Sequence, residues 1–214
     1  MSEINKRIIS SFLMLTILAF SYLNMFILTV VLIFIFFQIF YEFQYILKKI
    51  YQFKKKLTLY ILLIIILAYL SILIILIWLI INTKSNDVLL LYLIITTCIC
   101  TDIGGYTFGK IFKGKKLTKY SPNKTYSGLY GSYIFSFLTI YILFNNFFSL
   151  DKLFIFTFII SSVSQFGDIM ISFLKRKAKI KDTSNIIPGH GGILDRLDGV
   201  IFALPFVFLL KTFL

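Results

Sequence analysis

Charged and metal-ligating side chains are scarce in this chain. Only 14% of its 214 residues are charged, and it has nine acids, one histidine and two cysteines. Hydrophobic residues make up 59% of the chain, and the mean hydropathy is +0.92. Both values lie well outside the usual composition of soluble domains. The composition therefore excludes an ordinary soluble enzyme and predicts a membrane protein.

The two cysteines exclude a disulfide scaffold and a thiolate metal centre. Cys98 and Cys100 are two residues apart in an apolar run, so on a helix their side chains point in different directions and cannot easily pair. A lone C-x-C with no other thiol is also a poor metal site. We interpret both cysteines as packing residues.

The apolar runs predict the fold class. A bilayer core of roughly 30 Å needs about 20 apolar residues per helix. Such stretches occur at residues 8–23, 25–46, 58–81, 88–109, 129–149, 153–174 and 196–213. We expect an all-α, polytopic integral membrane protein with about seven transmembrane helices, although the first two stretches could instead form one bent hairpin. Because apolar sequence continues after Lys6 and Arg7, we expect no cleavable signal peptide.

Basic residues are distributed unevenly among the segments that connect these spans. One alternating set of segments holds 19 of the 22 basic residues, and the other holds Lys84, Lys152 and Lys211. Basic residues accumulate on the cytoplasmic side of membrane proteins, so the N-terminus is predicted in the cytoplasm and the C-terminus outside. The net charge of +13 then follows from topology and attraction to anionic lipid, without a nucleic acid partner.

A first polar cytoplasmic region runs from residue 101 to 132. It contains Asp102, five glycines between residues 104 and 128, and the run S-P-N-K-T at 121–125. Glycines allow close backbone approach, and exposed backbone N–H groups beside lysines bind phosphate, so the region predicts a phosphate site. A flexible basic loop is the alternative. Asp102 falls near the end of a span, where a carboxylate is tolerated if it meets a lysine, a metal or water.

A second polar region lies between residues 168 and 198. Asp168, Ser172 and Lys175 share one helix face, at i, i+4 and i+7. A purely structural alternative pairs Asp168 with Lys175 or Arg176 at the membrane interface. A turn-rich loop follows, in which His190 is flanked by glycines. This histidine is either an ordinary exposed loop residue or a group that approaches a phosphate.

Two acids open the last apolar stretch. Asp195 and Asp198 are three residues apart, so a helix places them on one face, where two oxygens can converge on one hard cation. The alternative is that either acid complements the positive N-terminus of the helix while Arg196 neutralises it. Asp168, at the cytoplasmic end of a neighbouring span, favours the metal site.

The residues from 172 to 198 follow the pattern S-x-[apolar]-K-R-x4-K-D-x-[small]-x2-[apolar]-P-x-H-G-G-[apolar]-x-D-R-[apolar]-D. This pattern resembles the C-terminal signature of the phosphatidate cytidylyltransferases, also called CDP-diacylglycerol synthases. The matching residues are Ser172, Lys175, Arg176, Lys181, Asp182, Ser184, Pro188, His190, Gly191, Gly192, Asp195, Arg196 and Asp198. The runs TDIGGYTFGK and SPNKT are similar to other cytoplasmic motifs of the family, and Glu42 is weakly similar to a family acid.

The resemblance implies transfer of CMP from CTP to phosphatidate, which gives CDP-diacylglycerol and pyrophosphate. It implies a Mg²⁺ site, with K⁺ as a second cation, for which the metal candidates are Asp168, Asp195 and Asp198. The catalytic candidates are Asp168, Lys175, Arg176, Asp195, Arg196 and Asp198. The substrate-binding candidates are Asp102, Ser121, Lys124, Thr125, Ser172, Lys181, Asp182, His190, Gly191 and Gly192.

The resemblance also predicts how the chain is organised. Residues 1–94 would form N-terminal transmembrane helices, and residues 95–214 a catalytic region with cytoplasmic loops at 110–128 and 175–195. The expected partners are CTP, phosphatidate and the bilayer, and many relatives pair through their spans, which suggests a homodimer. The expected location is the inner membrane of a bacterium, with the active site facing the cytoplasm.

Three positions depart from the family pattern. Tyr126 and Ser127 stand where the family often has a Trp-Glu pair, and Ile171 replaces a glutamate before the signature serine. The competing interpretations are a CTP-dependent enzyme acting on another lipid, of the CDP-archaeol synthase or polyprenol kinase type, and a transporter. Transporters usually place their coupling acids near the bilayer midplane, whereas the acids here fall at predicted cytoplasmic edges.

Overall fold

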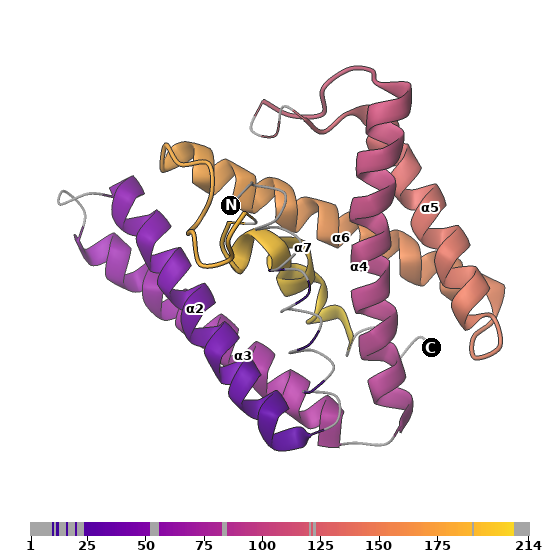
Figure 1. Ribbon diagram of the computed structural model, residues 1–214, viewed down its shortest axis with the longest axis horizontal. Coiled ribbons are helices and arrows are strands. Elements are labelled where there is room, and N and C mark those ends of the chain that lie inside the picture. The colour runs from indigo at the N-terminus through magenta and orange to yellow at the C-terminus, as the bar shows by residue number, and fades with distance from the viewer. Residues whose placement is uncertain are drawn as a thin grey trace. The chain divides into compact units, whose positions relative to one another are not determined.

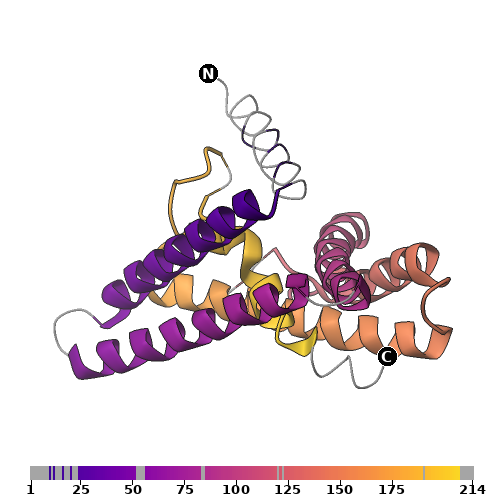
Figure 2. The same ribbon diagram turned by 90° about the horizontal axis from the view of Figure 1, so that it is seen from below.

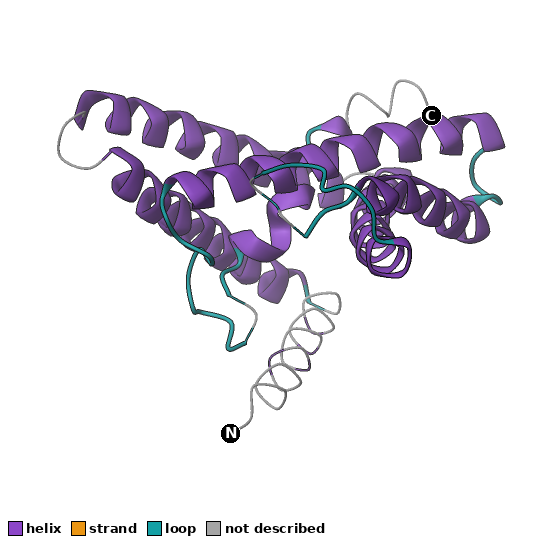
Figure 3. Ribbon diagram, turned by 90° about the horizontal axis from the view of Figure 1, so that it is seen from above, coloured by secondary structure: helices purple, strands orange, loops and turns teal. Residues whose placement is uncertain are grey.

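The structure is a computed structural model that describes residues 10, 12, 16, 20, 24–51, 56–82, 85–119, 121, 123–189 and 191–207. Within these ranges the chain forms helices α2 (Met25–Tyr51), α3 (Lys56–Asn82), α4 (Ser85–Phe112), α5 (Tyr126–Phe144), α6 (Leu150–Lys177) and α7 (Leu194–Ala203). Figure 3 shows helices joined by loops, and the described residues contain no strand. The expected all-α fold class is confirmed.

Five described helices are long and apolar enough to cross a membrane. These segments are Phe26–Tyr51, Lys56–Asn82, Val88–Phe112, Tyr126–Phe144 and Leu150–Lys177. They correspond to five of the predicted spans and confirm a polytopic membrane protein. The predicted span 8–23 lies almost entirely outside the described residues, as does the end of 196–213, so the expected number of seven stays a prediction.

The chain divides into two compact units. Unit 1 comprises Met1–Ile74 and Leu174–Leu197, and unit 2 comprises Ile75–Phe173 and Asp198–Leu214. In unit 1, α2 and the first part of α3 run in opposite directions, as Figure 2 shows. The functional division expected at residue 94 is a different kind of boundary and stays a prediction.

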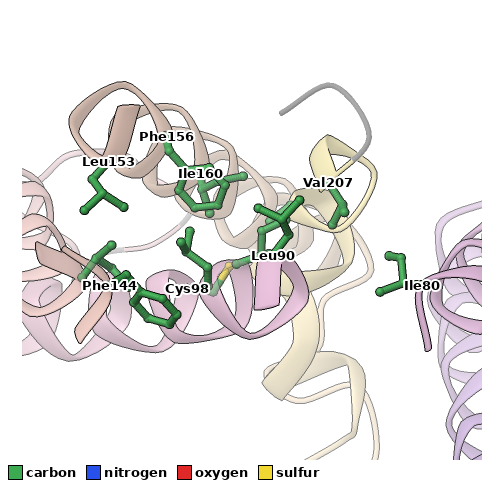
Figure 4. Packing of buried hydrophobic residues seen from close by; sticks show 12 residues of the cluster. Ile80, Leu90, Cys98, Phe144, Leu153, Phe156, Ile160 and Val207 are labelled. Atoms are coloured by element: carbon green, nitrogen blue, oxygen red, sulfur yellow. The ribbon is translucent and has the colours of Figure 1, made fainter. Parts of the chain in front are cut away.

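Unit 2 has an apolar core built from α4, α5 and α6. Leu153, Phe156 and Ile160 of α6 face Cys98 of α4 and Phe144 of α5 (Figure 4). The core also takes in residues after α7, including Val207. Both cysteines are buried and free, which confirms their interpretation as packing residues.

Helices α4 and α5 approach each other closely because glycines line their contact (Figure 1). A Cβ atom on Gly128 of α5 would lie 2.5 Å from the carbonyl oxygen of Gly105 on α4. The predicted span 88–109 contains the glycines of 104–109, so their place in a helix is confirmed. Helix α4 continues to Phe112, so the N–H groups of these glycines lie inside a helix, and their small size serves helix packing.

Helix α5 begins at Tyr126, three residues before the predicted start at 129. Thr125 has extended backbone angles, φ −120° and ψ 159°, and its hydroxyl accepts a hydrogen bond from the Gly128 N–H. This is N-cap geometry, in which a threonine oxygen satisfies an amide that the helix itself leaves unpaired. The cap therefore fixes where the loop ends and the helix begins.

We predict that Gly128→Ala destabilises the protein and that Gly105→Ala, the matched control, does not. A Cβ on Gly105 would lie 3.8 Å from its nearest neighbours, which is an ordinary contact, against 2.5 Å for Gly128. Overpacking costs about 1–3 kcal/mol, whereas Gly→Ala in an uncrowded helix position gains up to about 1 kcal/mol. Thermal unfolding of the purified protein in detergent measures both effects. Equal melting temperatures for the two variants would contradict the close approach of the helices.

Candidate active site

Unit 2 contains a pocket with a volume of about 290 Å³. Its walls are the C-terminal half of α4, the loop that follows α4, the first turns of α5 and the middle of α6. The lining residues are Thr101, Asp102, Gly105, Tyr106, Leu117, Ser121, Asn123, Lys124, Thr125, Gly128, Leu129, Ser132, Gln165 and Asp168. Five sequence candidates therefore lie together: Asp102, Ser121, Lys124, Thr125 and Asp168.

Backbone pairing in the loop brings Lys124 to the pocket. The Leu117 N–H donates to the Lys124 carbonyl at 2.8 Å, and the Tyr126 N–H donates to the Lys115 carbonyl at 3.1 Å. These bonds fold the loop back on itself just before the N-cap of α5. The S-P-N-K-T run is thus held at the pocket by the loop and the helix start together.

Lys124 forms an ion pair with Asp168 of α6. The two side chains are 26% and 23% exposed, so the pair is partly shielded from water and screened less than a surface pair. The alternative pairing of Asp168 with Lys175 is wrong, because the Lys175 Nζ atom bonds Asp195 at 2.7 Å instead. Asp168 thus interacts with a basic residue that is distant in sequence.

A second acid lies against Asp168. Asp198 is 8% exposed, its carboxyl group is within hydrogen-bonding reach of Asp168, and the charge of Asp102 also acts on it. Two carboxyl groups in contact repel each other when both are ionised, so such a pair needs a shared proton or a cation. Carboxylate oxygens are the ligands that hard divalent cations prefer. The donor set of Asp168 and Asp198 therefore fits such an ion, although the described residues contain no group of three or more acids, histidines or cysteines that could surround it.

In unit 1, Asp195 accepts hydrogen bonds from three residues of the signature segment, by which we mean residues 174–197. One of its oxygens accepts from Lys175 Nζ at 2.7 Å. The other accepts from the backbone N–H of Thr183 at 2.8 Å and from that of Gly192 at 3.0 Å. The carboxylate therefore joins the end of α6 and both sides of the loop to the first turn of α7.

The environment of Asp195 favours its charged form. Burial alone raises the pKa of Asp195, but the hydrogen bonds from Lys175, Thr183 and Gly192 and the charge of Lys175 outweigh burial, so the pKa lies below its ordinary value. Asp195 is thus a carboxylate with a built-in counter-charge.

A further carboxylate holds the same segment from α2. Glu42 is fully buried and accepts hydrogen bonds from the Thr183 hydroxyl at 2.5 Å and the Ser184 hydroxyl at 2.7 Å. It also accepts from the N–H groups of Ile193 at 3.0 Å and Leu194 at 2.9 Å. The signature segment is therefore fastened to a transmembrane helix that precedes it by some 140 residues.

Comparison with known proteins matches the sequence of the chain to one family. The model of the cytidylyltransferase family matches residues 2–214, nearly the whole chain. The chain belongs to the cytidylyltransferase family. The resemblance noted in the signature residues is thereby confirmed.

Several bacterial proteins of this family are similar to the chain, each named phosphatidate cytidylyltransferase. One from Rickettsia conorii is 44% identical over 117 residues, which cover 50% of each chain. One from Staphylococcus saprophyticus is 43% identical over 111 residues, 49% of this chain and 42% of its own. One from Helicobacter pylori is 40% identical over 114 residues, 51% of this chain and 42% of its own. The chain spans about half the length of the curated relatives it matches.

The signature candidates fall into distinct environments. Ser172 is half-buried on α6, and Gly192 is buried beneath Glu42. The exposed candidates are Arg176, Lys181, Asp182 and Arg196. Gly191 has a φ of +85°, which favours glycine. His190 lies outside the described residues. The roles assigned to all of these residues stay predictions.

Some pocket residues have no counterpart among the sequence candidates. Gln165 lies three residues before Asp168 on α6, and its side-chain amide donates to the Ser132 hydroxyl at 2.8 Å. Thr101, the residue before Asp102, bonds the Ser161 hydroxyl at 2.8 Å. A polar side chain at i−3 or i−1 from a candidate acid in an apolar helix was the available signal, because residues three apart share a face.

We predict that Thr183→Val destabilises the protein and that Thr183→Ser preserves it. Thr183 is 1% exposed, and its hydroxyl lies 2.5 Å from Glu42 and 3.0 Å from Asp195. Valine has nearly the same shape but leaves a buried carboxylate without this donor, at a cost of about 1–3 kcal/mol. Serine keeps the hydroxyl. The melting temperatures of both variants in detergent are the measurement, and a valine variant as stable as the wild type would show that the hydroxyl contributes nothing.

Proposed function

We propose that this protein transfers CMP from CTP to phosphatidate, forming CDP-diacylglycerol and pyrophosphate. The observation that supports it best is the pocket of unit 2, where Lys124 and the acids Asp102 and Asp168 meet in a chain of the cytidylyltransferase family. The names of the bacterial relatives agree with this substrate pair.

The proposed reaction joins two anions, so charge screening dominates its chemistry. A phosphate oxygen of phosphatidate attacks the α-phosphorus of CTP, and the bond from that phosphorus to the oxygen bridging to the β-phosphate breaks. The attacking phosphate is already ionised near neutral pH, so no strong general base is required. Lysine and the hydroxyl and amide groups that line the pocket can hold the phosphate oxygens. Positioning and electrostatics then carry most of the rate.

We propose Mg²⁺ as the cofactor, held by Asp168 and Asp198, and K⁺ as a second cation. The closeness of these two carboxyl groups supports the proposal, because Lys124 neutralises only one of their two charges and a divalent cation would relieve the remaining repulsion. When bound, the divalent ion supplies charge screening for the phosphates and for the leaving pyrophosphate. Asp195, whose oxygens accept bonds from Lys175, Thr183 and Gly192, remains the third candidate ligand.

We further propose that the enzyme lies in the cytoplasmic membrane of a bacterium, with the pocket facing the cytoplasm, and that it forms a homodimer. The bias of 19 basic residues to one set of connecting segments supports this orientation. A pocket at the cytoplasmic edge can receive CTP from water while phosphatidate stays in the inner leaflet.

We predict that membranes expressing this chain convert labelled CTP and phosphatidate to CDP-diacylglycerol when Mg²⁺ is present, and that Asp168→Asn reduces the rate on the order of 100-fold. The neutral amide keeps the shape of Asp168 but removes the charge that holds a cation. Thin-layer separation of the labelled lipid measures the product.

Asp151→Asn is the matched control for that experiment. Asp151 is an exposed acid in the first turn of the same helix, so the same chemical change there leaves the rate unchanged. No product from folded wild-type protein contradicts the proposed reaction. Supplying other lipid acceptors, such as archaetidyl precursors or a polyprenol, then distinguishes the remaining CTP-dependent reactions.

We predict that Lys124→Met raises KM for CTP or for phosphatidate about 10-fold, because a charged contact to a phosphate oxygen contributes about 1.5–3 kcal/mol. Lys119→Met is the control, since Lys119 is exposed on the same loop and does not line the pocket. Initial rates at varied concentrations of each substrate give both constants. A similar KM for the two variants would remove Lys124 from the substrate site.

A further inference from the structure

Glu42 is a buried charge that the proposed reaction does not use. It lies in the candidate span Phe26–Tyr51 and is fully buried. A buried ionised carboxylate is unfavourable by several kcal/mol unless its oxygens are fully hydrogen-bonded. A carboxylate in this position is therefore retained only where its neighbours compensate for it.

Five donors converge on the two oxygens of Glu42. Oε1 accepts from the Gln38 side-chain amide at 3.0 Å, the Ser184 hydroxyl at 2.7 Å and the Ile193 N–H at 3.0 Å. Oε2 accepts from the Thr183 hydroxyl at 2.5 Å and the Leu194 N–H at 2.9 Å. Four of these donors belong to the segment Thr183–Leu194, two at each of its ends.

The donors from Ile193 and Leu194 lie at the start of α7. The first N–H groups of a helix have no partner within the helix, and its N-terminus favours negative charge. Glu42 therefore caps α7 from another helix. The tip of the segment is closed separately, by backbone bonds of 3.0 and 3.1 Å between Ile187 and Gly191, whereas Glu42 contacts both ends of the segment at its base.

Gly192 leaves room for this carboxylate. A Cβ atom on Gly192 would overlap the Thr183 hydroxyl and the Glu42 carboxylate. Thr183 and Gly192 also donate their backbone N–H groups to Asp195, at 2.8 and 3.0 Å. The residues that meet Glu42 are thus the residues that orient Asp195, and through it Lys175.

We infer that Glu42 is a positioning residue, which holds the base of the segment Thr183–Leu194 and thereby fixes the orientation of Asp195, Lys175 and the glycine-rich tip for the binding of an anionic substrate. This inference rests on the proposed function for the word substrate, but the fastening of the segment stands on its own. Without Glu42 the segment samples other conformations, and the apparent affinity for a substrate falls with the fraction of molecules that remain competent to bind.

The test compares Glu42→Gln, Glu42→Ala and Ser184→Ala with the wild type, all as full-length protein in detergent. Glutamine keeps the shape of Glu42 but replaces one acceptor oxygen with an NH₂ donor, which opposes the donors of the segment. Hydrogen exchange followed by mass spectrometry reports the amides of residues 183–194 directly. Both Glu42 variants are expected to exchange there about 10-fold faster or more, and Ser184→Ala, which removes one donor of five, less so.

The kinetic measurement separates positioning from general stability. A loosened segment raises KM for CTP or phosphatidate. We expect an increase of about 10- to 100-fold, which is typical when a residue that orients the binding groups is lost. A smaller amount of folded protein instead lowers the apparent kcat and leaves KM unchanged. Gln44→Ala, a half-buried polar residue two positions along α2, is the matched control and should leave exchange and KM as in the wild type.

Each other outcome overturns the inference. Wild-type exchange in Glu42→Gln means that the carboxylate does not hold the segment. Faster exchange throughout α4 and α5 as well means that Glu42 stabilises the whole fold. Local loosening with both KM values unchanged means that the segment is held but does not position a substrate. If the wild type transfers no CMP, the proposed function fails, and the exchange measurement still decides whether Glu42 fastens the segment.

Discussion

The removal of carboxylates from water is the constraint on which the polar architecture of this protein depends. The chain has nine acids, and three of them are compensated in three different ways. Glu42 is compensated by neutral donors, Asp195 by Lys175 and two amides, and Asp168 by Lys124, while Asp198 lies against Asp168. A buried charge is tolerated only with such partners, so each acid also dictates where a loop or a helix start must lie.

The close approach of α4 and α5 forms one side of the pocket in unit 2. Gly104 and Gly128 let the two backbones meet, and the cap at Thr125 begins α5 at that contact. The loop before the cap can then deliver Lys124 to Asp168. Small residues thus bring α4 and α5 together in the apolar part of unit 2. The same contact brings the charged residues of the pocket close to one another.

The candidate site could be predicted only where its residues follow a local pattern in the sequence. Five residues that line the pocket were predicted from their places at span ends and in polar runs. They are Asp102, Ser121, Lys124, Thr125 and Asp168. The partners of the acids were not predicted. The expected partners of Asp168 were Lys175 and Arg176 on its own helix, whereas its partner is Lys124 from the loop before α5. The glycines of 104–109 were placed in a predicted span, but their contact with α5 was not predicted, because small size suits either a loop or a helix contact. Gln165 and Thr101 carried only a weak signal, a polar group beside an acid in an apolar run.

The sequence by itself determined the class of the protein, five of its spans and its family signature. Apolar length and signature spacing are local quantities, and the bilayer imposes the first of them on every helix that crosses it. Only the tertiary structure decided which charges meet. The contact of Glu42 with Thr183 joins residues 141 positions apart, and such a contact depends on how helices pack, which no periodicity in the chain encodes. Through that packing Glu42, which is only weakly similar to a family acid, fastens both ends of the segment Thr183–Leu194.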